Sequence, residues 1–517
     1  EERIVGPPAS VALADGGGYT KAGEGFARSQ GVPVGRLVTV ETDRGEYIAV
    51  VKRIRGRAVS SILRERIPEI VASVRFPKVM KWDSSGMRFA RPIRWILALH
   101  GRKVPRLEIG GLSSGRKTRL SPFLEKGIGV ASTSDYLPLL EEHGIILDGG
   151  ERGGEVLRMA REKAEEHGGR LVEDDELVGI VSNLLESPVA LAGRFDASFL
   201  GLPREVVVTA LKSHQRYFSV EDDSGALKPL FIAFADGARR NLGEIVKGYE
   251  RVLQARLADA EFYYREDTGL PLSELSMRLD RIVWLERLGT LAEKAARIEA
   301  LALFIRERAG VGGDELDGRI RRAARLAKAD LASEMVKDGK EFTKLQGYIG
   351  REYALASGEE PEVADAIFEH YLPRFSGDRL PGTDTGAILS VADKLDTIAG
   401  CFMIGLEPSG SQDPYALRRQ AFGVLRILLE RRMTIPLADL IGESVGLYRD
   451  AAEEGRGGVD AAAARERVRA FLGSRFSGML RDEGFDHDIV RALLSACLLY
   501  TSPSPRDRTR SRMPSSA

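Results

Sequence analysis

Three short segments of the chain place basic and aromatic side chains next to each other, a combination suited to RNA. Arginine and lysine neutralise phosphate groups, and aromatic faces stack on unpaired bases. We therefore predict an RNA-binding surface whose candidate residues are, in chain order, Lys78, Lys81, Arg88, Arg91, Arg94, Lys212, His214, Arg216, Arg418 and Arg419. The alternative is structural: Trp82, Trp95 and Phe218 would anchor the core, with the basic residues at its rim.

The last of these segments starts at Asp413 and runs into a predicted helix. One of Arg418 and Arg419 is expected to face a phosphate, while the other pairs with Asp413 or another acid. A solvated helix face is the simpler alternative. His214 precedes a predicted hairpin, so it either contacts RNA or forms a hydrogen bond within the turn.

A self-sufficient active site is missing from the sequence. Gly16-Gly-Gly18 followed by Lys21 has neither the spacing nor the strand-then-helix setting of a phosphate-binding loop. No dinucleotide fingerprint or nucleophile elbow occurs, and the six histidines are scattered rather than placed at zinc-ligand spacing. We therefore predict no catalytic residue and no metal ligand, and expect that any chemistry lies on another chain.

The composition sets limits on the class of protein. With 43% hydrophobic and 29% charged residues in 517, the chain has enough apolar material for sizeable cores. The 76 basic and 76 acidic residues cancel, so any RNA surface must come from local clustering. Cys401 and Cys497 are too few for a disulfide framework, and no apolar run approaches the roughly 20 residues of a membrane helix. We expect a cytoplasmic protein without a membrane partner.

The elements that position these residues change in character along the chain. Alternating residues with turn signals between them predict two hairpins, over 36–51 and 216–234, and residues 150–190 are predicted to be helical. From about residue 270, a buried helical stripe is expected from Leu275, Leu279, Ile282, Val283, Leu288 and Leu291. The predicted fold class is α+β and multidomain, with a mixed α/β N-terminal half followed by an all-helical half.

A series of motifs resembles one known family. Met80-Lys-Trp, Arg88-Phe-Ala-Arg-Pro-Ile-Arg-Trp, Ser213-His-Gln-Arg-Tyr-Phe, Arg256-Leu-Ala-Asp-Ala-Glu-Phe-Tyr-Tyr and Asp413-Pro-Tyr-Ala-Leu-Arg-Arg are similar to the beta subunits of bacterial-type glycyl-tRNA synthetases. Further blocks, such as Glu369-His-Tyr-Leu-Pro-Arg and Ala392-Asp-Lys-Leu-Asp-Thr, keep the same order. The resemblance is collinear from the first residues to about 495.

The resemblance implies an ATP-dependent glycine–tRNA ligase built as a heterotetramer of alpha and beta subunits. In that family the alpha subunit binds ATP, with magnesium, and makes glycyl-adenylate. The beta subunit holds the tRNA for glycine and is needed for the transfer step. The chain is expected to be a fragment of such a beta subunit that lacks the N-terminal start and the C-terminal anticodon-binding domain.

Residues 321–435 also resemble a degenerate HD-type metal phosphohydrolase domain. Asp330, His370 and Asp393 fall in the order of such a domain, but Ala329 stands where its diagnostic histidine is expected. A metal site needs imidazole and carboxylate ligands together. Asp393 and His370 are therefore interpreted as structural or RNA-facing, and Lys394 as a partner in a nearby ion pair. A stand-alone HD-type phosphohydrolase acting on nucleotides is the alternative function.

The predicted domain boundaries follow from these changes. They give a mixed α/β body over 1–270, a helical linker over 271–320, the degenerate HD-like domain over 321–435 and the start of a further helical region over 436–497. The last segment, 498–517, is basic and rich in proline and serine, and cannot bury a core. It is interpreted as a non-native tail, although a basic RNA-binding tail is the alternative.

Overall fold

A computed structural model describes residues 1–53, 56–120, 127–237, 240–337, 342–448 and 459–498. Apart from residue 498, the predicted tail lies outside these residues. The chain divides into two compact units, Glu1–Ile146 and Leu147–Ala517. The boundaries predicted at 270, 320 and 435 fall within the second unit and stay predictions.

The first unit begins with a three-stranded sheet in the order β1-β3-β2. The predicted first hairpin is confirmed: β2 and β3 are antiparallel, and Gly45 closes their turn with a φ of 109°. Ala12, Ala27, Leu37, Ile48 and Val50 form the small core of this sheet. The elements of the unit are β1 (Glu2–Pro8), α1 (Ala9–Ala12), α2 (Lys21–Ser29), β2 (Leu37–Thr42), β3 (Gly45–Lys52), α3 (Val59–Ser73), β4 (Glu108–Ile109), β5 (Leu112–Ser113), β6 (Lys117–Thr118), β7 (Ile128–Gly129) and α4 (Tyr136–Glu142).

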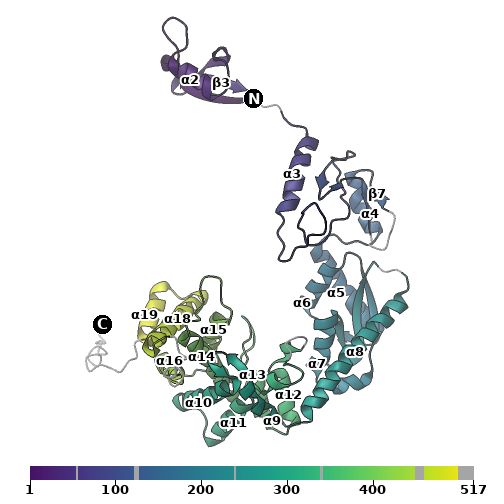
Figure 1. Cartoon of the computed structure of the whole chain (residues 1–517), viewed down its shortest axis with the longest axis vertical. Helices are drawn as coiled ribbons and strands as arrows, with labels where there is room; N and C mark the ends of the chain where they lie inside the picture. The colour runs from purple at the N-terminus through teal and green to yellow at the C-terminus, as the bar shows by residue number, and fades with distance from the viewer. Residues whose placement is uncertain (54–55, 121–126, 238–239, 338–341, 449–458, 499–517) are drawn as a thin grey trace, which may run out of the picture. The chain divides into compact units, whose positions relative to one another are not determined.

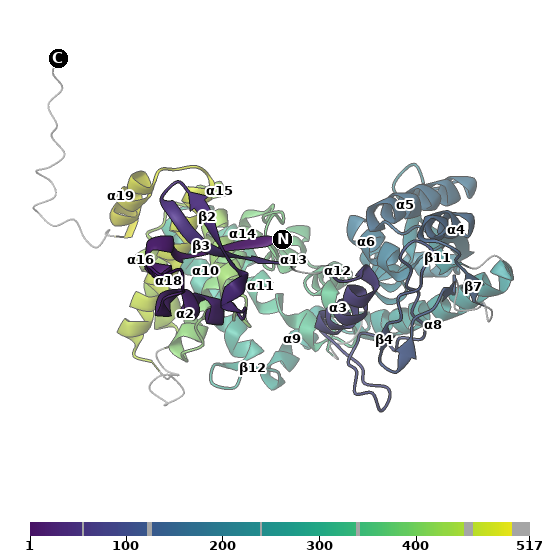
Figure 2. The same ribbon diagram turned by 90° about the horizontal axis from the view of Figure 1, so that it is seen from above.

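The second unit begins with a four-stranded sheet in the order β8-β10-β11-β9, and it contains the predicted second hairpin as β10 and β11. Alternate residues of β11 point to opposite faces. Leu230 and Ile232 pack with α5 and α6, whereas Phe231 and Ala233 join the core that includes α8. Figure 2 shows α5 and α6 beside this sheet. The elements here are α5 (Gly149–Glu166), β8 (Arg170–Leu171), α6 (Asp175–Leu184), β9 (Pro188–Arg194), α7 (Arg204–Thr209), a π-helix (Ala210–Gln215), β10 (Phe218–Glu221), β11 (Leu227–Asp236) and α8 (Leu242–Thr268).

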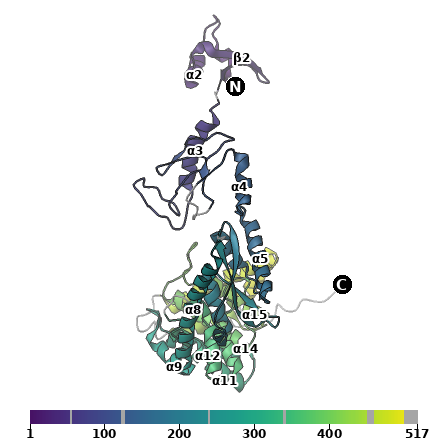
Figure 3. The ribbon, with the colours of Figure 1, turned by 90° about the vertical axis from the view of Figure 1, so that its right-hand side faces the viewer.

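The rest of the second unit is a helical assembly around one buried helix. Every residue of α14 from Thr385 to Met403 is buried, because α10, α11, α13, α15, α16 and α18 surround it (Figure 1). Figure 3 shows α11 and α14 together from a second direction. The elements are α9 (Leu272–Met277), β12 (Val283–Leu285), β13 (Gly289–Thr290), α10 (Leu291–Ala309), α11 (Asp314–Leu326), α12 (Tyr348–Ala356), α13 (Pro361–Glu369), α14 (Asp384–Met403), α15 (Leu417–Glu430), α16 (Leu437–Gly446), α18 (Ala461–Asp482) and α19 (His487–Leu498).

The structure supports the α+β class but corrects one detail of it. The predicted helical stripe from residue 275 to 291 is wrong, because α9 ends at Met277 and the chain then forms the β12–β13 hairpin. Val283, expected on the buried stripe, is 63% exposed. Gly289, with a φ of 87°, allows the turn that brings β13 back to β12. The predicted all-helical half therefore contains a short hairpin.

Candidate functional site

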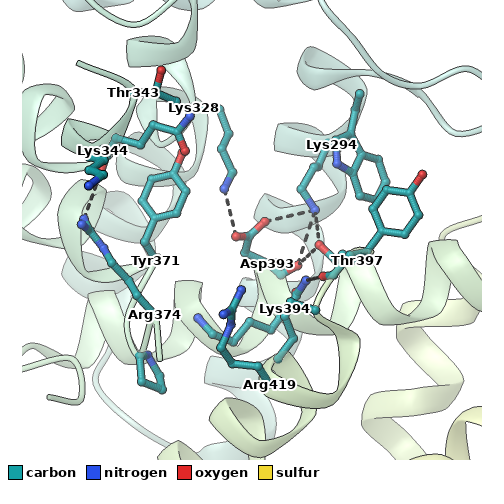
Figure 4. Close-up of a pocket in the computed structure, with 16 residues that line it drawn as sticks. Lys294, Lys328, Thr343, Lys344, Tyr371, Arg374, Asp393, Lys394, Thr397 and Arg419 are labelled. Atoms are coloured by element: carbon teal, nitrogen blue, oxygen red, sulfur yellow. Dashed lines mark hydrogen bonds and ion pairs between the residues drawn. The ribbon is translucent and has the colours of Figure 1, made fainter. Parts of the chain in front are cut away.

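A cavity of about 470 Å³ in the second unit is lined by α10, α14 and α15, by β12, and by the segments that carry Lys328, Lys344, Tyr371 and Tyr415. Its walls include Lys294 from α10, Lys328 from the segment after α11, and Asp393 with Lys394 from α14. Figure 4 shows these side chains and Arg419 of α15 around the same space. We call this cavity the cationic pocket; its sixteen lining residues are Trp284, Lys294, Lys328, Thr343, Lys344, Gln346, Tyr371, Pro373, Arg374, Asp393, Lys394, Thr397, Tyr415, Ala416, Arg419 and Gln420.

Local sequence fixes the helices that carry these groups. Thr290 and Glu293 form a capping box at the start of α10, so that Lys294 lies on its first turn. Asp413 accepts hydrogen bonds from the backbone N–H groups of Leu417 and Arg418, and so caps α15 just before Arg419. One of Arg418 and Arg419 was predicted to pair with Asp413 or another acid; the pairing with Asp413 is wrong, since its carboxylate binds backbone instead.

Two lysines hold the single carboxylate of the pocket. Lys294 Nζ lies 3.0 Å from Asp393 Oδ1, and Lys328 Nζ donates a 2.9 Å hydrogen bond to Asp393 Oδ2 (Figure 4). Burial alone would raise the pKa of Asp393, but the two ammonium groups hold it well below its usual range. Asp393 is consequently an ionised, structural anion with both oxygens engaged.

A second carboxylate, that of Asp396, also binds Lys294 but does not line the pocket. Asp396 is fully buried, and it accepts from Lys294 at 2.9 Å, from Arg297 at 2.8 Å and from the Tyr448 hydroxyl at 2.8 Å. Lys294 also lies 4.1 Å from the centre of the Trp284 ring. These contacts fix α10 against α14, and they leave Lys294 with carboxylate partners on both sides.

Positive charge exceeds negative charge around the cavity. Six of the lining residues are cationic, and Asp393 is the only acid among them. Burial, and neighbouring cations, lower the pKa of Lys328 and bring the pKa of Lys394 to about 7. Burial also lowers the pKa of Arg374. Buried cations without enough carboxylates are the arrangement that an incoming anion stabilises.

The three positions of the HD-type resemblance do not form a metal centre. Asp330 is buried and accepts a hydrogen bond from the Gly347 backbone N–H, and burial raises its pKa to about 6. His370 bonds the Ile367 carbonyl through Nδ1, and burial followed by Lys328 lowers its pKa well below the usual value. Within the described residues, no group of three or more histidine, cysteine, aspartate or glutamate side chains is arranged to hold a metal ion.

The predicted RNA-contacting residues fall into different environments. Lys78, Lys81, Arg88, Arg91 and Arg94 are all exposed in the first unit, where Trp95 is 40% exposed and Arg119 lies over its ring. Phe218, by contrast, is a core residue of the second unit.

Several of the predicted residues in the second unit are held by internal contacts. Lys212 pairs with Asp174 and Glu176, and the Arg216 side chain donates to the carbonyls of Lys212 and Ser213. The His214 ring packs edge-on against Phe342. Arg418 donates to the Gly410 carbonyl, so only Arg419 of the predicted arginines reaches the cationic pocket.

Sequence reasoning missed most of the pocket. Lys294, Lys328, Lys344 and Arg374 were not singled out, and Lys394 was expected to pair with an acid nearby. Its Nζ instead donates to the Leu372 carbonyl, the His370 carbonyl and Ser390 Oγ. A usable signal existed for Lys294, because helical spacing places it between Leu291 and Ile298 on a buried face, and a buried lysine requires a partner.

Comparison with known proteins shows which proteins the chain is similar to. Residues 1–495 match a family of aminoacyl-tRNA synthetase chains described as "Glycyl-tRNA synthetase beta subunit". The chain is 42% identical over 497 residues to the glycine–tRNA ligase beta subunit of Desulforamulus reducens, a match that covers 96% of this chain and 70% of the relative. The corresponding subunit of Syntrophomonas wolfei is 43% identical over 495 residues, covering 95% of this chain and 70% of the relative.

A third beta subunit, from Halalkalibacterium halodurans, is 42% identical over 496 residues, or 96% of this chain and 70% of the relative. The chain belongs to the glycyl-tRNA synthetase beta subunit family. The expectation drawn from the motifs is thus confirmed, and no finding supports the alternative of a stand-alone phosphohydrolase. Among the described residues, no helix combines the length and the apolar character needed to cross a bilayer.

Proposed function

We propose that the chain is the tRNA-binding beta subunit of a glycine–tRNA ligase and supports the ATP-dependent attachment of glycine to its tRNA. The observation that carries this proposal is the match over 96% of the chain to beta subunits of that enzyme. The proposed partners are an alpha subunit, with which the chain forms a heterotetramer, and the tRNA for glycine. The proposed compartment is the cytoplasm.

In this proposal, the adenylation reaction takes place on the alpha subunit. That subunit would bind ATP and magnesium, and this chain would position tRNA for the transfer step. The sequence supports this division because it contains neither a phosphate-binding loop nor a nucleophile elbow. The chain's own contribution is then binding and orientation, which can supply a large part of a catalytic rate enhancement.

The proposed tRNA contacts are the exposed cations of the first unit, Lys78, Lys81, Arg88, Arg91 and Arg94, and, as a separate contact on the second unit, Arg419. Exposure leaves their charges available to phosphate, and Trp95 offers an accessible ring for stacking. Lys212, His214, Arg216 and Arg418 remain proposed contacts. For Lys212, Arg216 and Arg418, binding would require exchange of the internal contacts described above.

We also infer that residues 321–435 are a degenerate HD-type domain in which lysines have replaced metal chemistry. Asp330, His370 and Asp393 all interact electrostatically with one residue, Lys328, which supports a shared origin for the three positions. An ammonium group beside each of them disfavours a divalent cation by charge repulsion.

The experiment that tests the proposed function measures two associations. The chain mixed with a purified alpha subunit should elute as one peak of summed mass in size-exclusion chromatography with light scattering. Fluorescence anisotropy should then show tRNA binding that weakens steeply with salt, because phosphate contacts release counterions. Separate elution together with salt-independent tRNA binding would contradict the proposal.

A charge-reversal pair tests the surface of the first unit. Lys78→Glu with Lys81→Glu should weaken tRNA binding and lower the slope of log affinity against log salt by roughly one per lost contact. The matched control reverses Arg28 and Arg36, which are also exposed in the first unit but lie outside the proposed surface. Equal effects of the two pairs would show that net charge alone matters, and would remove Lys78 and Lys81 from the site.

A further inference from the structure

Lys328 is a buried cation with spare hydrogen-bonding capacity. Its side chain is 6% exposed, and its Nζ donates one hydrogen bond, to Asp393 Oδ2. The Tyr371 ring lies 4.2 Å from the same nitrogen and supplies a cation–π contact but no acceptor. An ammonium group has three N–H donors. Within the described residues, two donors of Lys328 thus lack an acceptor at the wall of the cationic pocket.

Two hydroxyl groups at the same pocket also have unmet hydrogen-bonding capacity. Tyr371 Oη and Thr343 Oγ1 are inaccessible to solvent and have no hydrogen-bond partner among the described residues. A buried, unsatisfied hydroxyl destabilises a protein by about 1–3 kcal/mol. In Figure 4, Tyr371 lies between Lys328 and Arg374, on the opposite side of the cavity from Lys294. Each of the two hydroxyls, like the Lys328 ammonium, can donate a hydrogen bond to an acceptor oxygen of a ligand.

Arg419 of α15 adds a further hydrogen-bond donor to the cationic pocket. Its side chain is exposed and makes no hydrogen bond or ion pair with a described residue, whereas neighbouring Arg418 is bonded to Gly410. A guanidinium group offers paired N–H donors that match two oxygens of one phosphate. The pocket thus combines an exposed arginine with a buried ammonium and two buried hydroxyls.

The ligand that fits must bring several acceptor oxygens and more than one negative charge. A terminal phosphate has three such oxygens and a charge of about −1.5 to −2 at neutral pH. A carboxylate has fewer oxygens and a single charge, so it would leave more of the donors unsatisfied. The cavity of about 470 Å³ lies in the range of small-molecule sites, so it can also admit part of the group that carries the phosphate.

The geometry points to the cationic pocket as a metal-independent binding site for a terminal phosphate, held by Lys328, Tyr371, Thr343 and Arg419. The Lys328 ammonium supplies the positive charge that a bound divalent cation supplies in other phosphate sites. This site goes beyond the proposed tRNA surface, because an isolated phosphate can fill it. A free nucleotide and the 5′ end of an RNA both carry the required group.

The test is isothermal titration calorimetry of the full chain with inorganic pyrophosphate in the presence of a chelator. Tyr371→Phe removes one unpartnered hydroxyl without changing the ring, and it should weaken binding by about 10-fold. Arg419→Ala should weaken binding to a similar extent. The matched control, Arg426→Ala, removes the same charge from the same helix, but Arg426 does not line the pocket.

Unchanged pyrophosphate affinity in Tyr371→Phe, together with equal losses in the two arginine variants, would overturn the site. So would the absence of binding to the folded wild-type chain without metal. Circular dichroism checks that each variant is folded, and Thr343→Val provides a second hydroxyl deletion that should also weaken binding.

Competition then identifies the source of the phosphate. Displacement of pyrophosphate by a 5′-phosphorylated RNA oligonucleotide, but not by its 5′-hydroxyl form, supports the site and assigns it to an RNA end. Displacement by a nucleoside diphosphate but by neither oligonucleotide supports the site and assigns it to a free nucleotide. Equal displacement by chloride at matched ionic strength would contradict a phosphate-specific pocket.

Discussion

A network of buried charges joins α10 to α14 in the second unit. Asp396 is fully buried and neutralises two cations, Lys294 and Arg297, while the Tyr448 hydroxyl adds a third hydrogen bond. Burial of such a network is not in itself stabilising, because desolvation opposes the ionic attraction. Breaking it by removing one partner is nevertheless costly, since the remaining charges stay buried without compensation.

We predict that Asp396→Asn lowers the free energy of unfolding by about 3–5 kcal/mol. The amide keeps the shape of the side chain but leaves Arg297 without its carboxylate partner and Lys294 with only one of its two, Asp393. Denaturant titration followed by circular dichroism measures this change. Asp280→Asn is the control, because Asp280 is exposed and lies 4.0 Å from its nearest cation, Arg281. Similar small losses in both variants would show that solvent reaches the Asp396 network.

Lys394 gives the second unit a pH-dependent stability near neutrality. Burial, with Lys328 nearby, brings its pKa to about 7, whereas an unfolded lysine has a pKa of about 10.4. Between these values the unfolded state binds a proton that the folded state lacks, so this group makes stability rise with pH from about 7 towards 10.4. Below about pH 7 both states hold the proton, and its contribution is constant.

We therefore predict a different pH slope for Lys394→Met, which cannot titrate. Between pH 7.5 and 8.5 the wild-type chain should gain about 1 kcal/mol of unfolding free energy relative to the variant. Denaturant titrations of both proteins at the two pH values provide the measurement. The contributions of other titratable groups cancel when the variant is subtracted from the wild-type chain. Parallel pH profiles would mean that Lys394 stays charged in the folded state over this range.

At the scale of elements, α14 shows how closely the helical assembly is packed. A methyl group added at Gly400 would lie 2.5 Å from the Tyr448 hydroxyl and 2.8 Å from a Leu288 methyl carbon. Tyr448 cannot move aside without losing its hydrogen bonds to Asp396. Gly318 lies on the exposed side of α11, and a methyl group there meets nothing within 4 Å.

Alanine substitutions at these two glycines should therefore change the free energy of unfolding in opposite directions. Gly400→Ala is expected to destabilise the chain by about 1–3 kcal/mol through overpacking. Gly318→Ala is expected to stabilise it by about 0.5–1 kcal/mol, because alanine restricts the unfolded chain and favours the helix. Thermal unfolding of both variants checks the prediction. A stabilised Gly400→Ala protein would show that α14 can shift relative to α16 and its flanking residues.

At the scale of elements, the sequence predicted some parts of the structure and not others. The hairpin of β2 and β3 was predictable because alternation and the Gly45 turn are local signals. The helix expected over 275–291 failed because apolar spacing alone does not distinguish a short helix followed by a hairpin from one long helix. The pocket was only partly predictable, since Lys328 and Asp393 are 65 residues apart and meet through tertiary packing.

The whole molecule contains two units whose buried clusters do not mix in the part of the chain that the structure describes. The clusters around Ile48 and around Leu140 lie within Glu1–Ile146, whereas the large cluster around α14 and the sheet cluster lie within the second unit. The first unit buries few apolar residues for its length. Small cores of this kind give marginal stability.

We predict that residues 147–498 fold without the first unit. Differential scanning calorimetry of the full chain should then show two transitions, with the first unit unfolding at the lower temperature because its apolar clusters are small. The truncated chain should retain the upper transition at an unchanged midpoint, since its cores are all present.

The truncated chain should also keep pyrophosphate binding, because every residue lining the cationic pocket lies between 284 and 420. Affinity for tRNA should fall and become less dependent on salt, because the exposed lysines and arginines of residues 78–94 are absent. A truncated chain that unfolds several degrees below the upper transition would show instead that the two units stabilise one another.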